Sequence, residues 1–154
     1  MKNSSALEFR QVVPGFDTVL GDFFEALQGN GDFRLFHPHE LSRQEARRLC
    51  AYKGKDLYYI GVEANRVLCY GMLRGWDEGY KVPSLGIAIH PELRGSGLAS
   101  AFMHFLHAAA KLAGAKQVRL KVYKHNQIAK NLYGRLGYRY QEASPTELLG
   151  ILEL

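Results

Sequence analysis

The sequence has few cysteines and no long apolar run. Cys50 and Cys69 are the only cysteines in 154 residues, too few for a disulfide framework, so we expect two buried thiols and a cytoplasmic protein. No apolar run reaches the roughly 18 residues of a membrane span, and the N-terminus has no apolar signal core. With 47% hydrophobic and 23% charged residues, the composition indicates one soluble domain over residues 1–154 that needs no membrane.

Acidic residues are also absent from one long stretch. Between Glu92 and Glu142 there is no aspartate or glutamate, whereas nine lysines and arginines occur there and the net charge is +5. This half of the chain therefore carries a positive field that favours an anionic ligand. Nucleic acid is one such ligand, but no helix-turn-helix, zinc or RNA-recognition signature is present, and we expect no nucleic-acid partner.

Hydrophobic periodicity predicts an α+β fold, with a mixed central sheet of about seven strands and helices on both faces. The expected order is β-α-α-β-β-β-α-β-α-β-β. Strands are expected near residues 7–13, 57–62, 67–73, 83–89, 118–122, 138–140 and 148–154. Helices are expected over 16–27, after a Ser42 cap, over 97–113, and from Asn126 to Gly137.

Residues 94–99 read RGSGLA, directly between an apolar strand and a helix without acidic residues. Gly95 and Gly97 can adopt conformations that residues with a side chain avoid, so the turn can aim backbone N–H groups at a phosphate. A dinucleotide-binding turn would need glycine or alanine where Ser100 stands and an acidic residue about 20 positions later, which is absent. A P-loop would need Gly-Lys-Ser/Thr, also absent.

This turn resembles the acetyl-CoA signature [Q/R]-x-x-G-x-[G/A] of the GCN5-related N-acetyltransferase (GNAT) superfamily, and the lead-in His90-Pro-Glu is frequent there. A second motif of that family resembles the segment from Asn126 through Ala129 and Leu132-Tyr133 to Leu136-Gly137-Tyr138. The resemblance implies the GNAT fold, an acyltransferase activity that acetylates amines, and acetyl-CoA as co-substrate.

The resemblance also assigns roles. The strand end, where a bulge tolerated by Gly86 is expected, would pair with the pantetheine amides, and the turn would hold the pyrophosphate. Asn126 would reach the pantetheine arm, and Tyr133 would be the general acid that protonates the CoA thiolate. The implied cofactor-binding residues are Ile87, Ala88, Ile89, Arg94, Gly95, Ser96, Gly97, Leu98, Ala99, Ser100, Asn126 and Tyr133.

The general base is not evident in the sequence. The strand over 85–89 lacks the glutamate that many relatives carry, and Lys121 stands where relatives that acetylate protein N-termini often have glutamate. Glu78 and His90 are the candidate catalytic bases, and a water chain is the alternative. His104 and His107 lack a third ligand, so no metal is expected.

The acceptor site is expected to be aromatic and polar, with a loop between the first two helices overhanging it. Its expected residues are His37, His39, Tyr58, Trp76, Asp77 and Glu78. Such a site favours a nucleotide-linked amino sugar as acceptor. The alternatives are a protein, peptide or other small amine, or a CoA-binding module without catalysis. Family habit also allows a homodimer through the C-terminal segment.

Overall fold

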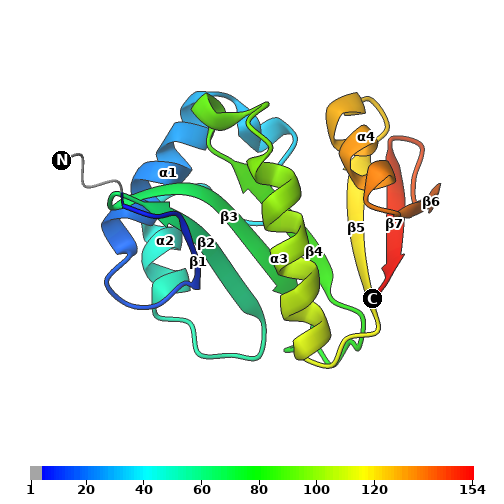
Figure 1. Cartoon of the computed structure of the whole chain (residues 1–154), viewed down its shortest axis with the longest axis horizontal. Helices are drawn as coiled ribbons and strands as arrows, with labels where there is room; N and C mark the ends of the chain where they lie inside the picture. The colour runs from blue at the N-terminus through cyan, green and yellow to red at the C-terminus, as the bar shows by residue number, and fades with distance from the viewer. Residues whose placement is uncertain (1–4) are drawn as a thin grey trace.

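Residues 5–154, described by a computed structural model, form seven strands, four α-helices and two single-turn 3-10 helices (Figure 1). The strands are β1 (Glu8–Gln11), β2 (Leu57–Glu63), β3 (Arg66–Arg74), β4 (Ser84–Ile89), β5 (Gln117–Tyr123), β6 (Arg139–Glu142) and β7 (Glu147–Glu153). The helices are α1 (Asp17–Gly29), α2 (Arg43–Cys50), α3 (Leu98–Leu112) and α4 (Gln127–Arg135), with 3-10 turns η1 (Asp32–Arg34) and η2 (Pro91–Leu93). The predicted fold class and element order are confirmed.

All strands belong to one sheet in the order β1-β2-β3-β4-β5-β7-β6. Neighbouring strands pair antiparallel except β4 and β5, which are parallel and share the single register pair Ser84–Arg119. The sheet therefore consists of a four-stranded part and a three-stranded part that meet at the start of β4 and diverge beyond it (Figure 1).

One face of the four-stranded part is covered by α1 and α2. Phe24 of α1 packs edge-on against Tyr70 of β3 with ring centroids 5.2 Å apart, and both side chains are fully buried. Ser42 caps α2 as predicted, since its hydroxyl accepts a bond from the Glu45 N–H at 3.1 Å. This packing fixes the ends of the loop that joins the two helices.

The opposite face of the sheet is covered by α3, and α4 lies on the same side over β5 and β7 (Figure 1). Phe102 and Leu106 of α3 lie so close to β3 that a Cβ on Gly71 would come within 2.8 Å of each side chain. Glycine is therefore needed at position 71 for α3 to approach the sheet. His107 also anchors α3, because its Nε2 lies 2.8 Å from the Tyr138 hydroxyl.

The cysteines are buried and unpaired, as predicted. Burial raises the pKa of the Cys50 thiol to about 11 and that of Cys69 to about 12. Both therefore remain neutral thiols at physiological pH and pack as small apolar side chains.

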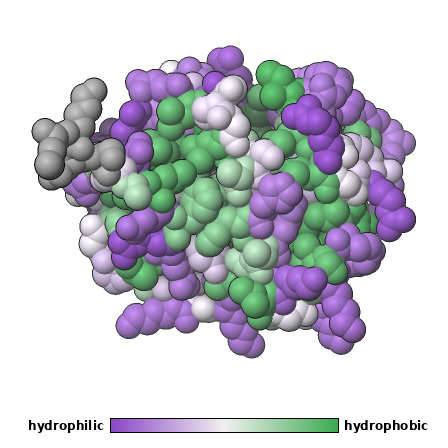
Figure 2. All heavy atoms as spheres, in the orientation of Figure 1, coloured by the Kyte–Doolittle hydropathy of each residue, from purple (hydrophilic) through white to green (hydrophobic). Residues whose placement is uncertain are grey.

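Seen from the α3 side, apolar side chains are exposed near the middle of the surface, and hydrophilic ones dominate the edge (Figure 2). Leu112, at the end of α3, is 90% exposed. Within residues 5–154 no helix is long and apolar enough to cross a bilayer. The C-terminal strand β7 lies between β5 and β6, so its backbone is already paired on both sides.

Candidate active site

The glycine-rich turn leads from β4 into α3. Gly95 (φ 77°) and Gly97 (φ 87°) both have left-handed backbones, and no atom lies within 4 Å of a Cβ built on either residue. Backbone conformation, rather than packing, therefore requires glycine there. The Ser96 hydroxyl donates to the Leu93 carbonyl at 2.6 Å and accepts from the Leu98 N–H at 3.3 Å. The following N–H groups of the first turn of α3 have no intrahelical acceptor and can bind an anion.

Arg94 immediately precedes this turn, and its side chain reaches the loop that joins α1 to α2. Its Nη2 lies 2.6 Å from a carboxylate oxygen of Asp32, the first residue of η1, and the Asp32 side chain is only 12% exposed. The turn that would hold pyrophosphate is thus tied to the segment that leads into residues 35–38. Arg94 remains about half exposed, so its other N–H groups stay accessible to a phosphate.

The divergence of β4 from β5 leaves the facing strand edges without a shared ladder beyond Ser84. Ile87 and Ile89 point toward the α3 side and Ala88 toward the α1 side. The bulge expected near Gly86 is absent, because β3 and β4 pair in continuous register from Cys69–Ile89 to Arg74–Ser84. The strands separate because β5 turns away, and Gly86 instead makes room for Met72, whose Cε would lie 2.6 Å from an added Cβ.

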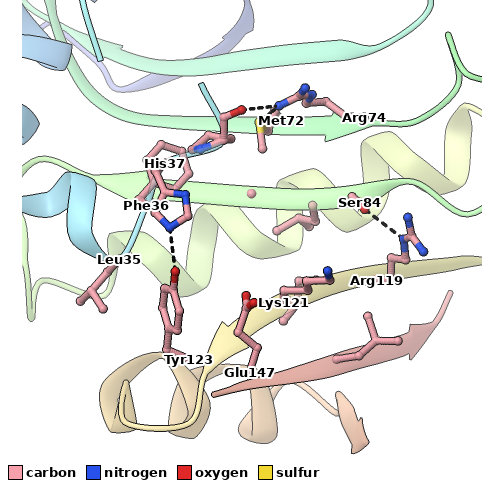
Figure 3. Close-up of a pocket in the computed structure, with 15 residues that line it drawn as sticks. Leu35, Phe36, His37, Met72, Arg74, Ser84, Arg119, Lys121, Tyr123 and Glu147 are labelled. Carbon is pink, nitrogen blue, oxygen red and sulfur yellow. Dashed lines mark hydrogen bonds between the residues drawn. The ribbon is translucent and has the colours of Figure 1, made fainter. Parts of the chain in front are cut away.

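A cavity of about 390 Å³ lies in this divergence, on the face that carries α1 and α2 (Figure 3). Strands β3, β4, β5 and β7 supply its floor, and the loop after η1 covers it. The lining residues are Leu35, Phe36, His37, Pro38, Met72, Arg74, Ser84, Leu85, Gly86, Arg119, Leu120, Lys121, Tyr123, Glu147 and Leu149.

The covering loop is held at both ends of the cavity. At the wide end His37 Nε2 lies 2.7 Å from the Tyr123 hydroxyl, so this bond joins the loop to the end of β5 (Figure 3). At the narrow end Arg74 Nη1 donates to the Pro38 carbonyl at 3.0 Å. These contacts hold the loop over part of the cavity, which remains open to solvent elsewhere.

Helix α4 carries the second predicted motif. The Asn126 side chain accepts a bond from the Ala129 N–H at 3.3 Å, so its oxygen caps α4 and its amide NH₂ remains available. Tyr133 is half-buried, with its ring 5.7 Å from that of Tyr138. Burial raises the pKa of the Tyr133 phenol well above its ordinary value, with a smaller contribution from Tyr140. The phenol is therefore fully protonated at neutral pH.

Of the six predicted acceptor residues, His37 alone lines the cavity. His39 is bonded through Nε2 to the buried Tyr70 hydroxyl at 2.8 Å and through Nδ1 to the Glu40 carbonyl, and burial lowers its pKa. Tyr58 lies on β2, one strand further away, and packs against Tyr52. Tyr58 thus belongs to the core beneath α1 and α2, and the largely buried His39 ring packs against Phe24 of α1 with ring centroids 5.3 Å apart.

The other predicted acceptor and base residues lie outside the cavity lining. Trp76 packs on the α3 side, and the Asp77 carboxylate accepts bonds from the Tyr52 hydroxyl and the Lys55 N–H. Glu78 lies in the exposed turn between β3 and β4. His90 caps η2 through Nδ1, which accepts from the Glu92 N–H at 3.2 Å.

Several cavity residues escape sequence reasoning. They are Arg74, Ser84, Arg119, Lys121, Tyr123 and Glu147. The usable signal is strand alternation, since Val118, Leu120 and Val122 are buried on one face of β5 and the intervening residues must face the other. The cavity lies on the side of the sheet where the loop between α1 and α2 packs. The sequence of that loop does not show where it packs.

Comparison with known proteins gives independent support for the family that the sequence motifs indicate. The family model described as "Acetyltransferase (GNAT) family" matches residues 24–138. The GNAT domain of S. lividans PAT superposes with a TM-score of 0.81 at 14% identity, covering 96% of this chain and 90% of that one. A GCN5-related N-acetyltransferase from Kribbella flavida gives 0.78 at 20% identity, covering 97% and 98%. The ribosomal L7/L12 alpha-N-protein acetyltransferase RimL, in complex with coenzyme A, gives 0.74 at 13% identity, covering 96% and 94%.

The features of this chain fit coenzyme A. The left-handed glycines and the start of α3 can accommodate an anion, and the edges of β4 and β5 that diverge beyond Ser84 have backbone groups free to pair with amides. The sequence motifs, the fold and the family model, which matches most of the chain, all indicate the same family. The chain therefore belongs to the acetyltransferase (GNAT) family, and it is an acyltransferase of the kind that uses acetyl-CoA to acetylate amines.

Proposed function

We propose that the protein acetylates the primary amine of a small molecule, with a nucleotide-linked amino sugar as the favoured acceptor class. The cavity beside the divergence of β4 and β5 carries this proposal. Its volume of about 390 Å³ and the loop of residues 35–38 that lies over it favour a sugar-sized amine over an extended peptide. A peptide acceptor would have to displace the His37–Tyr123 bond that spans the cavity.

In this proposal the backbone of Gly95 to Ser100 binds the pyrophosphate of acetyl-CoA, and Arg94 adds a charge-assisted bond. The open edge at Ile87, Ala88 and Ile89 pairs with the pantetheine amides, and the Asn126 amide lies at the start of the adjacent helix. Acetyl-CoA supplies the activated acetyl group. This placement directs the thioester toward Gly86, where the cavity begins.

Tyr133 is the proposed general acid. The acceptor nitrogen forms a bond to the thioester carbonyl carbon, the carbon–sulfur bond breaks, and the electron pair goes to sulfur. The Tyr133 hydroxyl, which its raised pKa keeps protonated, then gives its proton to that sulfur. The acceptor nitrogen loses its second proton as the amide forms, and that proton restores the phenol through water. A phenol at this place thus removes the need for solvent to protonate the leaving group.

The acceptor ammonium must lose a proton before it attacks. Glu147 supplies the only carboxylate among the fifteen residues around the cavity, and it projects from β7 beside Lys121 and Tyr123 (Figure 3). We assign Glu147, directly or through water, as the proton acceptor. Glu78 and His90 remain sequence-based candidates, and the single variants Glu78→Gln, His90→Gln and Glu147→Gln separate the three through their pH–rate profiles.

Two measurements test the proposal. Thermal unfolding is followed with acetyl-CoA, free CoA and ATP, and acetyl-CoA at about 100 times its Kd is expected to add about 2.7 kcal/mol, which raises Tm by roughly 5–11 °C. Thiol release is then measured with amino sugars, nucleotide-linked amino sugars, polyamines and peptides. A peptide preference contradicts the acceptor assignment, whereas stabilisation by CoA without thiol release from any amine identifies a non-catalytic module.

A further inference from the structure

The cavity carries an excess of positive charge. Three cationic side chains, Arg74, Arg119 and Lys121, line it against one carboxylate, that of Glu147. Among residues 5–154, none of the three cations has a carboxylate oxygen within 4.0 Å. Most other arginines of the described chain have such a partner, so the lining of this cavity, with three cations and the single Glu147 carboxylate, keeps an excess of positive charge.

The two arginines occupy one lateral row of the sheet. Arg74 of β3 pairs with Ser84 of β4, and Ser84 pairs with Arg119 of β5, so the three side chains share a face at the narrow end of the cavity. Arg119 Nε donates to the Ser84 hydroxyl at 3.0 Å, and its guanidinium lies 5.6 Å from the centroid of the Tyr80 ring. Arg74 is held by its bond to the Pro38 carbonyl.

These bonds fix the position of both guanidinium groups and leave most of their N–H groups unused. A guanidinium has five donors, and each protein bond above takes one of them. Both arginines therefore keep free N–H donors on the face that carries the Ser84 hydroxyl, and a phosphate or carboxylate can accept bonds from such donors.

We infer that the acceptor amine carries an anionic oxygen group, a phosphate or a carboxylate, which binds between Arg74 and Arg119 at the narrow end of the cavity. This inference rests on the proposed function and specifies its acceptor. The anion neutralises the unpaired charge that the cavity otherwise holds.

Strand geometry sets the distance between the two ends of such an acceptor. Pantetheine bound along β4 ends near Gly86, and Ser84 lies two residues away, roughly 6.6 Å along the strand. The anionic group is therefore several bonds from the amine, as in a phosphorylated amino sugar. An α-amino acid, whose carboxylate lies next to its amine, is too short to span the two positions.

The same charges exclude one acceptor class and assist another. Arg74, Arg119 and Lys121 repel a polyamine or a lysine-rich peptide. For an acceptor with one amine and one anionic group, the cations bind the anion and disfavour the ammonium form of the amine. The neutral nucleophile thus becomes more accessible without a strong base, consistent with the single carboxylate in the lining.

The first test compares acceptors that differ only in charge. Glucosamine 6-phosphate is compared with glucosamine, and 5-aminopentanoate with 5-aminopentanamide, by thiol release at saturating acetyl-CoA. We expect kcat/KM to be at least about tenfold higher for the anionic member of one pair, the gain from one charge-assisted bond. The pair that shows this difference identifies the preferred anionic group as phosphate or as carboxylate. Equal values within both pairs overturn the inference.

The second test removes one guanidinium. Arg119→Gln is expected to raise KM for the preferred anionic acceptor by about 10–100-fold, while KM for its neutral counterpart and for acetyl-CoA changes less than about twofold. Arg119→Lys restores part of the loss, because it keeps the charge without the planar fork. Arg139→Gln, on the exposed strand β6, is the matched control and leaves all values unchanged. Equal losses for charged and neutral acceptors contradict the inference.

A different result would show that the proposed function, rather than the anion site, is wrong. No stabilisation by acetyl-CoA and no thiol release with any amine count against an acetyltransferase with this acceptor class. The anion site is then judged by calorimetric titration of inorganic phosphate and of glucosamine 6-phosphate. Binding that Arg119→Gln abolishes and Arg139→Gln preserves supports the inference, whereas no binding, or binding insensitive to Arg119→Gln, overturns it.

Discussion

Replacing Gly97 by alanine tests whether the turn before α3 depends on a left-handed backbone. Gly97 has φ 87°, and no atom lies within 4 Å of the Cβ that alanine would add. The cost is therefore conformational only, and the left-handed region costs a residue with a Cβ about 1–2 kcal/mol. In a chain of 154 residues this corresponds to a Tm lowered by roughly 2–8 °C.

Gly29→Ala is a control with the same chemical change and the opposite expected sign. Gly29 is the last residue of α1, its φ is not positive, and no atom lies within 4 Å of an added Cβ. Alanine in a helical position is expected to stabilise the protein by about 0.5–1 kcal/mol. Urea denaturation of the two variants and wild type measures both signs under identical conditions.

The Gly97 variant also reports on coenzyme A. Strain at this residue shifts the N–H groups of the first turn of α3, so we expect the Kd for acetyl-CoA to rise at least about tenfold in Gly97→Ala and to stay unchanged in Gly29→Ala. Unchanged stability of Gly97→Ala would refute the conformational argument. Lower stability with unchanged affinity would show that phosphate binds elsewhere.

Tyr133→Phe is expected to lower kcat by about 100-fold or more and to change KM for acetyl-CoA less than about twofold, measured by steady-state thiol release; an unchanged kcat would exclude the general-acid role. Asp56→Ala removes the buried Oδ1 that accepts bonds from the N–H groups of Gly75 (3.0 Å), Trp76 (2.9 Å) and Asp77 (3.3 Å), so we expect a loss of about 1.5–3 kcal/mol by urea denaturation. A loss under about 0.5 kcal/mol would mean that water replaces the carboxylate. Burial, aided by His104, lowers the pKa of His107 to about 4, whereas an unfolded histidine titrates near ~6.5. The unfolded state therefore binds more protons between these two pH values, and the free energy of unfolding falls as pH falls from about 6.5 to 4. His107→Gln is expected to reduce this dependence of stability on pH. Identical dependences for the variant and wild type would contradict the lowered pKa of His107.

The glycine-rich turn that we propose as the coenzyme A site could be recognised in the sequence because its residues are contiguous. The turn at 94–99 brings its strand, its glycines and its helix start together along the chain, and each has a local conformational signature. The hairpin between β2 and β3 is equally local, since Ala64 and Asn65 adopt φ of 50° and 59° in its two-residue turn.

The cavity that we propose as the acceptor site could not be predicted in the same way, because it combines residues from distant segments. Arg74, Arg119 and Glu147 meet only after β4 pairs with β5 and β5 pairs with β7. His39 and Trp76 have side chains that suit a polar acceptor site, yet tertiary packing places His39 beneath α1 and Trp76 toward α3. Residue type alone does not specify which face of a sheet a side chain occupies.

The alternation along β5 has a consequence for how this protein can change over evolutionary time. The side chains that reach the cavity, Arg119, Lys121 and Tyr123, alternate with Val118, Leu120 and Val122, which fill the core beneath α3 and α4. Mutation of a cavity residue on β5 therefore leaves the buried half of the strand intact. Preference for the proposed acceptor can drift by single substitutions at little cost in folding, while the turn proposed to hold acetyl-CoA stays under constraint from its own backbone.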